Sequence, residues 1–157
     1  MSDPRVGQGF DVHAWAPGRE LWLGGLRFDS PDGLAGHSDG DAVCHAVADA
    51  LLGAAVLGDV GEHFPDTDPS VAGMAGLELL RRTVDLVAVR TGLAPVSCDL
   101  TVICERPSIG PRRDEMRAAL AGALGVSLDR VSVKATRPEG LGLTGAGVGC
   151  LALAVLG

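Results

Sequence analysis

Three polar side chains near the start of the chain have the types and spacing of a metal site. Asp11 and His13 are two residues apart, so on a β-strand both side chains point to the same face. His45 lies in a stretch rich in Ala and Leu that predicts a helix. A carboxylate with two imidazoles is typical of catalytic zinc, which keeps a fourth position open. The alternative is that these are ordinary polar residues at the edge of a small core.

Polar residues around the predicted helix extend this pattern. His37 and Ser38 come directly before the helix, where exposed N–H groups attract anions, and both side chains can donate to phosphate oxygens. The simpler interpretation is that Ser38 only caps the helix. Asp41, His45 and Asp49 are spaced by four and share a helix face. Asp49 or a backbone carbonyl would accept from the second nitrogen of a metal-bound His45, whereas a solvated acidic face is the alternative.

Two later segments also carry chemistry. Residues 58–73 are rich in Asp, Pro and Gly and predict a long binding loop suited to polyol hydroxyls, with a solvated turn as the alternative. Residues 134–142 join a strand to a glycine-rich turn. Glu139 is a hard oxygen ligand suited to Mg²⁺ shared with substrate phosphates, and Thr136 and Arg137 can donate to phosphate. The glycine spacing does not fit a Walker A or dinucleotide-binding loop.

Composition narrows the class of protein. The chain has 157 residues, which predicts one domain over residues 1–157. A net charge of −7 and the absence of Tyr argue against nucleic-acid binding, and an anionic substrate would need metal ions to supply positive charge. The N-terminus has no signal-peptide character and the longest apolar run, residues 148–156, is too short to span a membrane. The four cysteines lack a C-x-x-C pattern and are expected as core residues in the cytoplasm.

The polar groups need a scaffold, and the sequence predicts an α+β domain with a mixed β-sheet and helices packed on one face. Predicted helices begin at Ser38 or Asp39 and near residue 74, where the second ends at Gly92, and a third spans 111–124. The pair Gly24-Gly25 predicts a bulge or close backbone approach, and residues 30–33 predict a turn. Predicted strands cover residues 5–13, 20–28, 98–104, 131–135 and 148–156.

The last predicted strand is apolar on both sides. A continuous apolar strand has both of its faces covered. Because the helices cover one face of the sheet, we expect another subunit to cover the other face, in an oligomer. The alternative is a central strand of a monomer with helices on both faces.

Six motifs in order along the chain resemble the 2-C-methyl-D-erythritol 2,4-cyclodiphosphate synthase family of non-mevalonate isoprenoid biosynthesis. The resemblance extends from Arg5 to Leu156. Several long motifs in a fixed order are far more specific than one short pattern. The motifs are GFDVH at 9–13, GHSDGD at 36–41, DALLGA at 49–54, LGDVGEHFPDTDP at 57–69, KAT at 134–136 and LGLTG at 141–145.

The resemblance implies a homotrimer with active sites between subunits and a trimer interior against the open sheet face. It implies zinc bound by Asp11, His13 and His45, and Mg²⁺ or Mn²⁺ near Glu139. The implied substrate is 4-diphosphocytidyl-2-C-methyl-D-erythritol 2-phosphate, whose 2-phosphate oxygen attacks the β-phosphorus. CMP leaves and a cyclic diphosphate forms. We expect neither a nucleic acid nor a membrane as a partner.

The resemblance also implies the residues that contact substrate. His37, Arg137 and Glu139 are expected at the reaction centre, with Ser38 beside His37 on the phosphate. The methylerythritol side is expected to include Asp11, His13, Asp59, Gly61, Phe64, Asp66 and Asp68. The cytidine pocket is expected from segments 104–110 and 135–139, which include Cys104, Ser108, Ile109, Gly110, Ala135 and Thr136. Leu143 and Ala146 are further expected substrate contacts.

Three segments depart from the family pattern. Arg137 stands where the family commonly has Thr, and Ser108 where it has Lys, so we expect Arg137 to replace the missing cation. The family's GRGEG is GAGVG at 145–149, which predicts a more apolar trimer channel. Two alternatives stay open: a non-catalytic zinc and cytidine-nucleotide-binding paralogue, and a zinc phosphoesterase that uses water as nucleophile.

Overall fold

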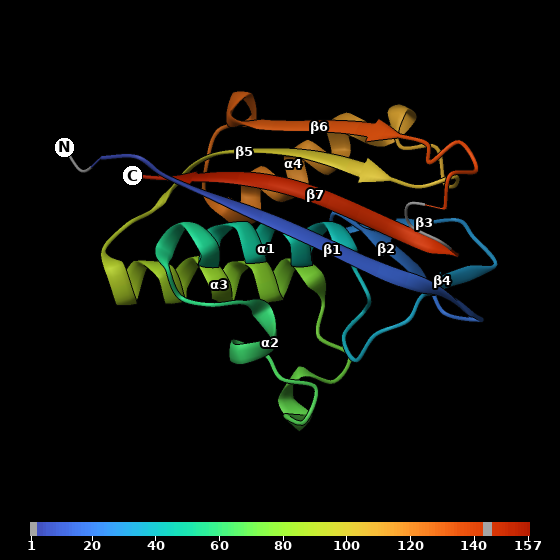
Figure 1. The fold of residues 1–157 in the computed structure, drawn as a ribbon, viewed down its shortest axis with the longest axis horizontal. Coiled ribbons are helices and arrows are strands. Elements are labelled where there is room, and N and C mark those ends of the chain that lie inside the picture. The colour runs from blue at the N-terminus through green and yellow to red at the C-terminus, as the bar shows by residue number, and fades with distance from the viewer. Residues whose placement is uncertain (1–2, 143–145) are drawn as a thin grey trace.

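A five-stranded mixed sheet with helices on one side forms the protein (Figure 1). The structure is a computed structural model that describes residues 3–142 and 146–157. The strand order is β4-β1-β7-β5-β6, in which β5 and β6 run parallel and the other neighbours antiparallel. Its strands are β1 (Arg5–Pro17), β4 (Asp32–Leu34), β5 (Pro95–Ile103), β6 (Val131–Thr136) and β7 (Gly147–Leu156).

Three long helices cover one face of this sheet. On β7 the residues that face the helices, such as Ala152 and Ala154, are fully buried, whereas Leu151 and Leu153 between them are 38% and 44% exposed. This alternation confirms the single α+β domain with helices on one face and rules out the two-sided monomer. The helices are α1 (Ala42–Ala55), α3 (Gly76–Thr91) and α4 (Arg113–Leu124). None of the helices in the described residues is long and apolar enough to cross a membrane.

Helix α1 lies unusually close to β1 because two strand residues lack a side chain. A Cβ atom at Gly7 would collide with the backbone carbonyl of Ala50, and one at Gly9 with that of Ala46. This close approach brings the far part of β1 within reach of the side chains at the start of α1. The two glycines therefore set the distance between the strand and the helix that carry the candidate metal ligands.

Three predictions about the N-terminal half differ from the structure. The predicted strand at residues 20–28 is a hairpin of β2 (Leu21–Leu23) and β3 (Leu26–Phe28), because Gly24 and Gly25 both adopt positive φ and form a tight turn. The predicted turn at residues 30–33 ends in β4, which pairs with the end of β1 and aligns Leu34 with Trp15. The predicted loop at residues 58–73 contains the short helix α2 (Val60–His63) and a 3₁₀ turn at Pro69–Val71.

The predicted cap of the first long helix was also wrong. Asp41, which is fully buried, caps α1 and accepts hydrogen bonds from the N–H groups of Val43 and Cys44. Its carboxylate also accepts from the N–H groups of Gly24 and Gly25, each at 2.8 Å. One buried carboxylate thus joins the β2–β3 turn to the start of α1. This arrangement leaves the Ser38 hydroxyl available for another partner.

Other predicted elements are confirmed. Helix α3 ends where Gly92 adopts the left-handed conformation, and all four cysteines are buried and unpaired. Helix α4 begins two residues later than predicted, after a 3₁₀ turn at Gly110–Arg112. The outer sheet face is open in the single chain, and its β1 and β7 residues form an apolar patch of Val6, Phe10, Val12, Leu151 and Leu153.

Candidate metal centre and two separate cavities

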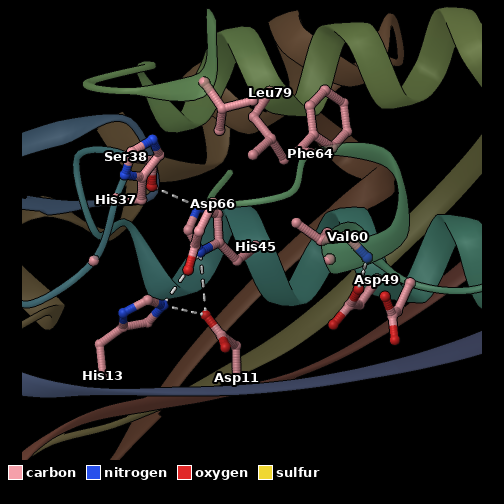
Figure 2. A pocket seen from close by; sticks show the side chains of 14 residues that line it. Asp11, His13, His37, Ser38, His45, Asp49, Val60, Phe64, Asp66 and Leu79 are labelled. Atoms are coloured by element: carbon pink, nitrogen blue, oxygen red, sulfur yellow. Dashed lines mark hydrogen bonds and ion pairs between the residues drawn. The ribbon is translucent and has the colours of Figure 1, made fainter. Parts of the chain in front are cut away.

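The three candidate metal ligands converge in space (Figure 2). Asp11 and His13 share the helix-facing side of β1, and His45 reaches toward them from the first turn of α1. His13 Nε2 lies 2.7 Å from Asp11 Oδ2 and 3.2 Å from His45 Nδ1. His45 Nδ1 lies 3.3 Å from Asp11 Oδ2. The strand and helix therefore present three donor atoms to a single point.

The outer nitrogen of each imidazole already has an oxygen partner. His13 Nδ1 donates to the Ala35 carbonyl at 2.5 Å, which leaves the Nε2 lone pair directed at the cluster. His45 Nε2 lies 3.1 Å from Ser38 Oγ, so its Nδ1 is directed at the cluster as well. Asp49, the expected partner of His45, instead accepts from the Val60 N–H at 2.8 Å and holds the start of α2. Such outer partners fix the tautomer and orientation of metal-binding histidines.

The electrostatics of the cluster favour a cation. Burial by itself would raise the pKa of Asp11, but hydrogen bonds and charge from His13 and His45 outweigh it and lower the pKa to about 2. Burial by itself would lower the pKa of His13, but the Asp11 carboxylate outweighs it and raises that pKa. Without a metal ion, a proton on His13 would supply the positive charge that the ionised Asp11 carboxylate attracts. A divalent metal ion would supply that charge more fully than a proton.

A cavity of about 340 Å³ opens beside this cluster. His37 and Ser38 line it, with His37 exposed and Ser38 buried, so the expected phosphate donors lie close to the expected metal ligands. The predicted residues on the α2 segment that also line it are Asp59, Gly61, Phe64 and Asp66. Asp68 lies outside this lining, and its carboxylate accepts from the Ser70 N–H at 2.9 Å. We refer to this space as the metal-side cavity.

A second cavity of about 140 Å³ lies between the β5–α4 loop and the end of β6. We refer to it as the nucleotide-side cavity. It gathers most of the residues expected on the cytidine side, although they come from two segments about thirty positions apart. They are Cys104, Ser108, Ile109, Gly110, Ala135, Thr136 and Arg137, together with Pro107.

Besides Asp68, three expected site residues are not placed in either cavity. Glu139 is exposed and adopts a positive φ of 53°, just beyond the residues that line the nucleotide-side cavity. Ala146 is exposed just before β7, and Leu143 lies outside the described residues. Val148 corrects one expectation about the open face, because it is fully buried on the helix-covered side of β7 and cannot line a channel there.

The two cavities share no lining residue in the described part of the chain. His37 therefore lies at one cavity and Arg137 at the other, although the sequence places both at one reaction centre. For both cavities to belong to one active site, as the resemblance implies, a second chain or a rearrangement has to bring them together.

Arg19 holds the backbone at the metal-side cavity and was not predicted from the sequence. Arg19 donates to the carbonyl oxygens of Gly36 and Ser38, both at 2.7 Å, and so grips the backbone on either side of His37. An arginine nineteen residues from its partner gives no local signal. A planar guanidinium can bridge two carbonyls at fixed spacing, which a lysine cannot.

Together, the fold and the site define an α+β domain with a candidate metal centre beside a cavity lined by polar residues. The chain belongs to the YgbB family, whose model matches residues 4–157. A 2-C-methyl-D-erythritol 2,4-cyclodiphosphate synthase from Symbiobacterium thermophilum is 53% identical over 150 residues, which cover 96% of this chain and 95% of that protein.

A longer bifunctional enzyme and a solved structure are also similar to this chain. The bifunctional enzyme IspD/IspF of Caulobacter vibrioides is 53% identical over 152 residues, covering 97% of this chain but 40% of that enzyme. This chain therefore spans about two fifths of the length of that bifunctional relative. A solved structure of a 2C-methyl-D-erythritol-2,4-cyclodiphosphate synthase in a CDP-bound form has a TM-score of 0.89 at 38% identity. It covers 98% of this chain and 100% of that one.

Proposed function

We propose that this protein converts 4-diphosphocytidyl-2-C-methyl-D-erythritol 2-phosphate to 2-C-methyl-D-erythritol 2,4-cyclodiphosphate and CMP. In this proposal the enzyme is a cytoplasmic homotrimer that binds zinc at Asp11, His13 and His45, and Mg²⁺ or Mn²⁺ near Glu139. The observation that carries the proposal is the convergence of these three ligands beside His37 and Ser38. The relatives named as cyclodiphosphate synthases support it.

The donor set fits zinc. Zinc bonds of about 2.0–2.1 Å in a tetrahedron separate neighbouring donor atoms by roughly 3.3 Å. The two separations that involve His45 Nδ1 are 3.2 and 3.3 Å, whereas Asp11 and His13 are closer at 2.7 Å. A carboxylate and two imidazoles leave the fourth position to substrate, as catalytic zinc sites do.

The reaction joins two anionic groups, and the chain's own residues would reduce their repulsion. The 2-phosphate oxygen forms a bond to the β-phosphorus, the bond from that phosphorus to the CMP oxygen breaks, and CMP leaves with the electron pair. Zinc, when bound, stabilises negative charge on phosphate oxygens as a Lewis acid. His37 and Ser38 would donate to the methylerythritol-side phosphate and hold it in line for attack. Asp59 and Asp66 would bind polyol hydroxyls and hold the carbon chain folded.

The separation of the two cavities supports active sites between subunits. In the proposed trimer, the nucleotide-side cavity of one subunit would complete the metal-side cavity of its neighbour. The apolar patch on the open sheet face would be buried among subunits, since an exposed apolar surface of this kind is typical of an interface. Thr136 and Arg137 would then donate to the diphosphate, with Glu139 holding the second ion.

Incubation of the purified protein with substrate, Zn²⁺ and Mg²⁺, followed by phosphorus NMR, tests the proposal against two alternatives. Cyclic diphosphate together with CMP supports the synthase. CMP with a linear product would show a phosphoesterase that uses water. Cytidine nucleotide that binds without turnover would show a non-catalytic paralogue, and either of the last two results overturns the proposal.

A further inference from the structure

The loop that supplies half of the nucleotide-side cavity is fixed at both of its ends. The Cys104 N–H donates to the Thr136 carbonyl at 3.2 Å, which extends the pairing of β5 with β6. Ile109 is buried, and its carbonyl accepts from the Arg112 N–H. Between these ends, Ser108 is exposed. The shape of the middle of this loop therefore depends on whatever holds residues 105–107.

Arg106 reaches from this loop away from the cavity toward β1 and β4. Its guanidinium carbon lies 3.9 Å from the centre of the Trp15 ring. One terminal nitrogen donates to Asp32 at 3.0 Å, and the other donates to Ser30 at 3.2 Å. Stacking sets the plane of the guanidinium while the two hydrogen bonds set its rotation within that plane.

Glu105, the residue before Arg106, contacts a different part of the fold. The Glu105 carboxylate accepts from the Gly140 N–H at 3.3 Å, and so contacts the segment that follows β6. Pro107, directly after Arg106, lines the nucleotide-side cavity. Consecutive residues thus attach the loop to two separate parts of the fold next to the cavity wall.

We propose that Arg106 is a positioning residue for nucleotide binding, an inference that rests on the proposed function. Arg106 holds residues 105–108 in the shape that accepts a cytidine nucleotide, without contacting the ligand. The side chain of Arg106 is 46% exposed and that of Asp32 is 28% exposed. Exposed ion pairs contribute little to stability, so the main effect of this contact is on the order of the loop. A loop ordered before binding loses less conformational entropy when the ligand arrives.

The test replaces Arg106 with Met, which keeps the aliphatic length of the side chain but loses its charge and both hydrogen bonds. Calorimetric titration of the zinc-loaded protein with CDP should show affinity about three- to ten-fold weaker than wild type. With substrate, KM should rise by a similar factor while kcat stays within about twofold, because Arg106 does not touch the reacting groups. Zinc content should be unchanged, because the metal ligands lie on β1 and α1.

Arg82→Met is the matched control. Arg82 pairs with Glu78 at 2.9 Å on the exposed side of α3, so this variant also removes one arginine and one exposed ion pair. Its CDP affinity and KM should match wild type. A folded Arg106→Met protein with CDP affinity and KM within twofold of wild type would overturn the role of Arg106.

Trp15 provides a second measurement that reports on the contact itself. In a Trp22→Phe background Trp15 is the remaining tryptophan, so its emission reports on the stacked guanidinium. CDP should change this emission in the background protein and leave it unchanged once Arg106→Met is added. Equal CDP responses in both proteins would overturn the coupling. Failure of the wild-type protein to bind CDP at all would instead overturn the nucleotide assignment, and with it this inference.

Discussion

The two cavities are built in different ways. The metal-side cavity takes its candidate ligands from β1 and α1, two regular elements brought together by glycines, and hydrogen bonds to Ala35 and Ser38 orient the two histidines. The nucleotide-side cavity is lined mostly by loop residues, and exposed contacts such as the Arg106–Asp32 pair hold that loop. Metal coordination tolerates errors of only a few tenths of an ångström, whereas a nucleotide can be bound by adjustable loops. Rigid elements therefore suit the first task and loops the second.

Removing a metal ligand should have the largest effect. His45→Ala should abolish zinc binding and lower turnover by at least about 100-fold, because the remaining two ligands cannot hold a zinc ion. Elemental analysis and the phosphorus NMR assay measure both quantities. His63→Ala is the control, since His63 donates to the Leu57 carbonyl outside the cluster and its variant should keep zinc. Stoichiometric zinc in His45→Ala would show that the ligand set is wrong.

A charge on the open sheet face should disrupt the proposed assembly and lower turnover while leaving the metal centre intact. Leu153→Glu places an unpaired carboxylate in the proposed apolar interface, which costs about 3–5 kcal/mol when buried. We expect light scattering to show dissociation, with turnover lower by about 10- to 100-fold at micromolar protein and zinc content unchanged.

Leu153→Met keeps the apolar character of that position and should stay assembled and active. A Leu153→Glu protein that is monomeric yet fully active would contradict the completion of the site by a neighbouring subunit.

Moving β1 away from α1 should impair the candidate metal centre and leave the nucleotide-side cavity intact. Gly9→Ala forces a Cβ against the Ala46 carbonyl and should lower the free energy of unfolding by about 1–3 kcal/mol. Zinc affinity should fall because Asp11 and His13 move relative to His45, while the CDP affinity of the folded protein stays near wild type. Denaturant unfolding and zinc titration measure these changes.

Gly122→Ala is the control for this substitution. Gly122 lies on α4 and a Cβ there meets nothing within 4 Å, so stability should rise by about 0.5–1 kcal/mol. Unchanged zinc affinity in Gly9→Ala would show that the ligands do not depend on this close approach.

The smallest effect is expected at the nucleotide-side cavity, where Ser108 and Arg137 differ from the family pattern. Ser108 and Arg137 both line that cavity, which supports the idea that one cation replaces another. Arg137→Thr should lower kcat/KM by about tenfold, and Ser108→Lys added to it should recover most of the loss. The double-mutant cycle should show a coupling of about 1 kcal/mol. Additive effects would mean that Arg137 and Ser108 act independently.

Local sequence signals predicted much of the scaffold. Glycine after an apolar helix stripe predicted the end of α3 at Gly92, where only a residue tolerant of positive φ fits well. Because Asp11 and His13 are two residues apart, they were predicted on one face of a strand. Helical propensity placed His45 on α1. The prediction that β7 is apolar on both faces is confirmed, although the two faces differ in the size of their side chains. Its buried face carries alanines against α1, and its open face carries leucines.

Contacts between distant residues could not be predicted in the same way. Asp41 caps α1 rather than Ser38 because its carboxylate also binds the β2–β3 turn, seventeen residues earlier. Ser38 is left to support His45, and Arg19 holds the backbone around His37. Each of these hydrogen bonds depends on which polar groups come together when segments distant in the sequence pack against each other.

The sequence by itself determined the residue types of the metal site, the strand and helix that carry them, and membership of a family by its motifs. Only the tertiary structure decided which nitrogen of each histidine faces the cluster, and that His37 and Arg137 lie at different cavities of one chain. The physical reason is that backbone propensities and side-chain periodicity act over a few residues. Hydrogen-bond partners and shared cavities are instead set by packing among segments that the chain brings together from far apart.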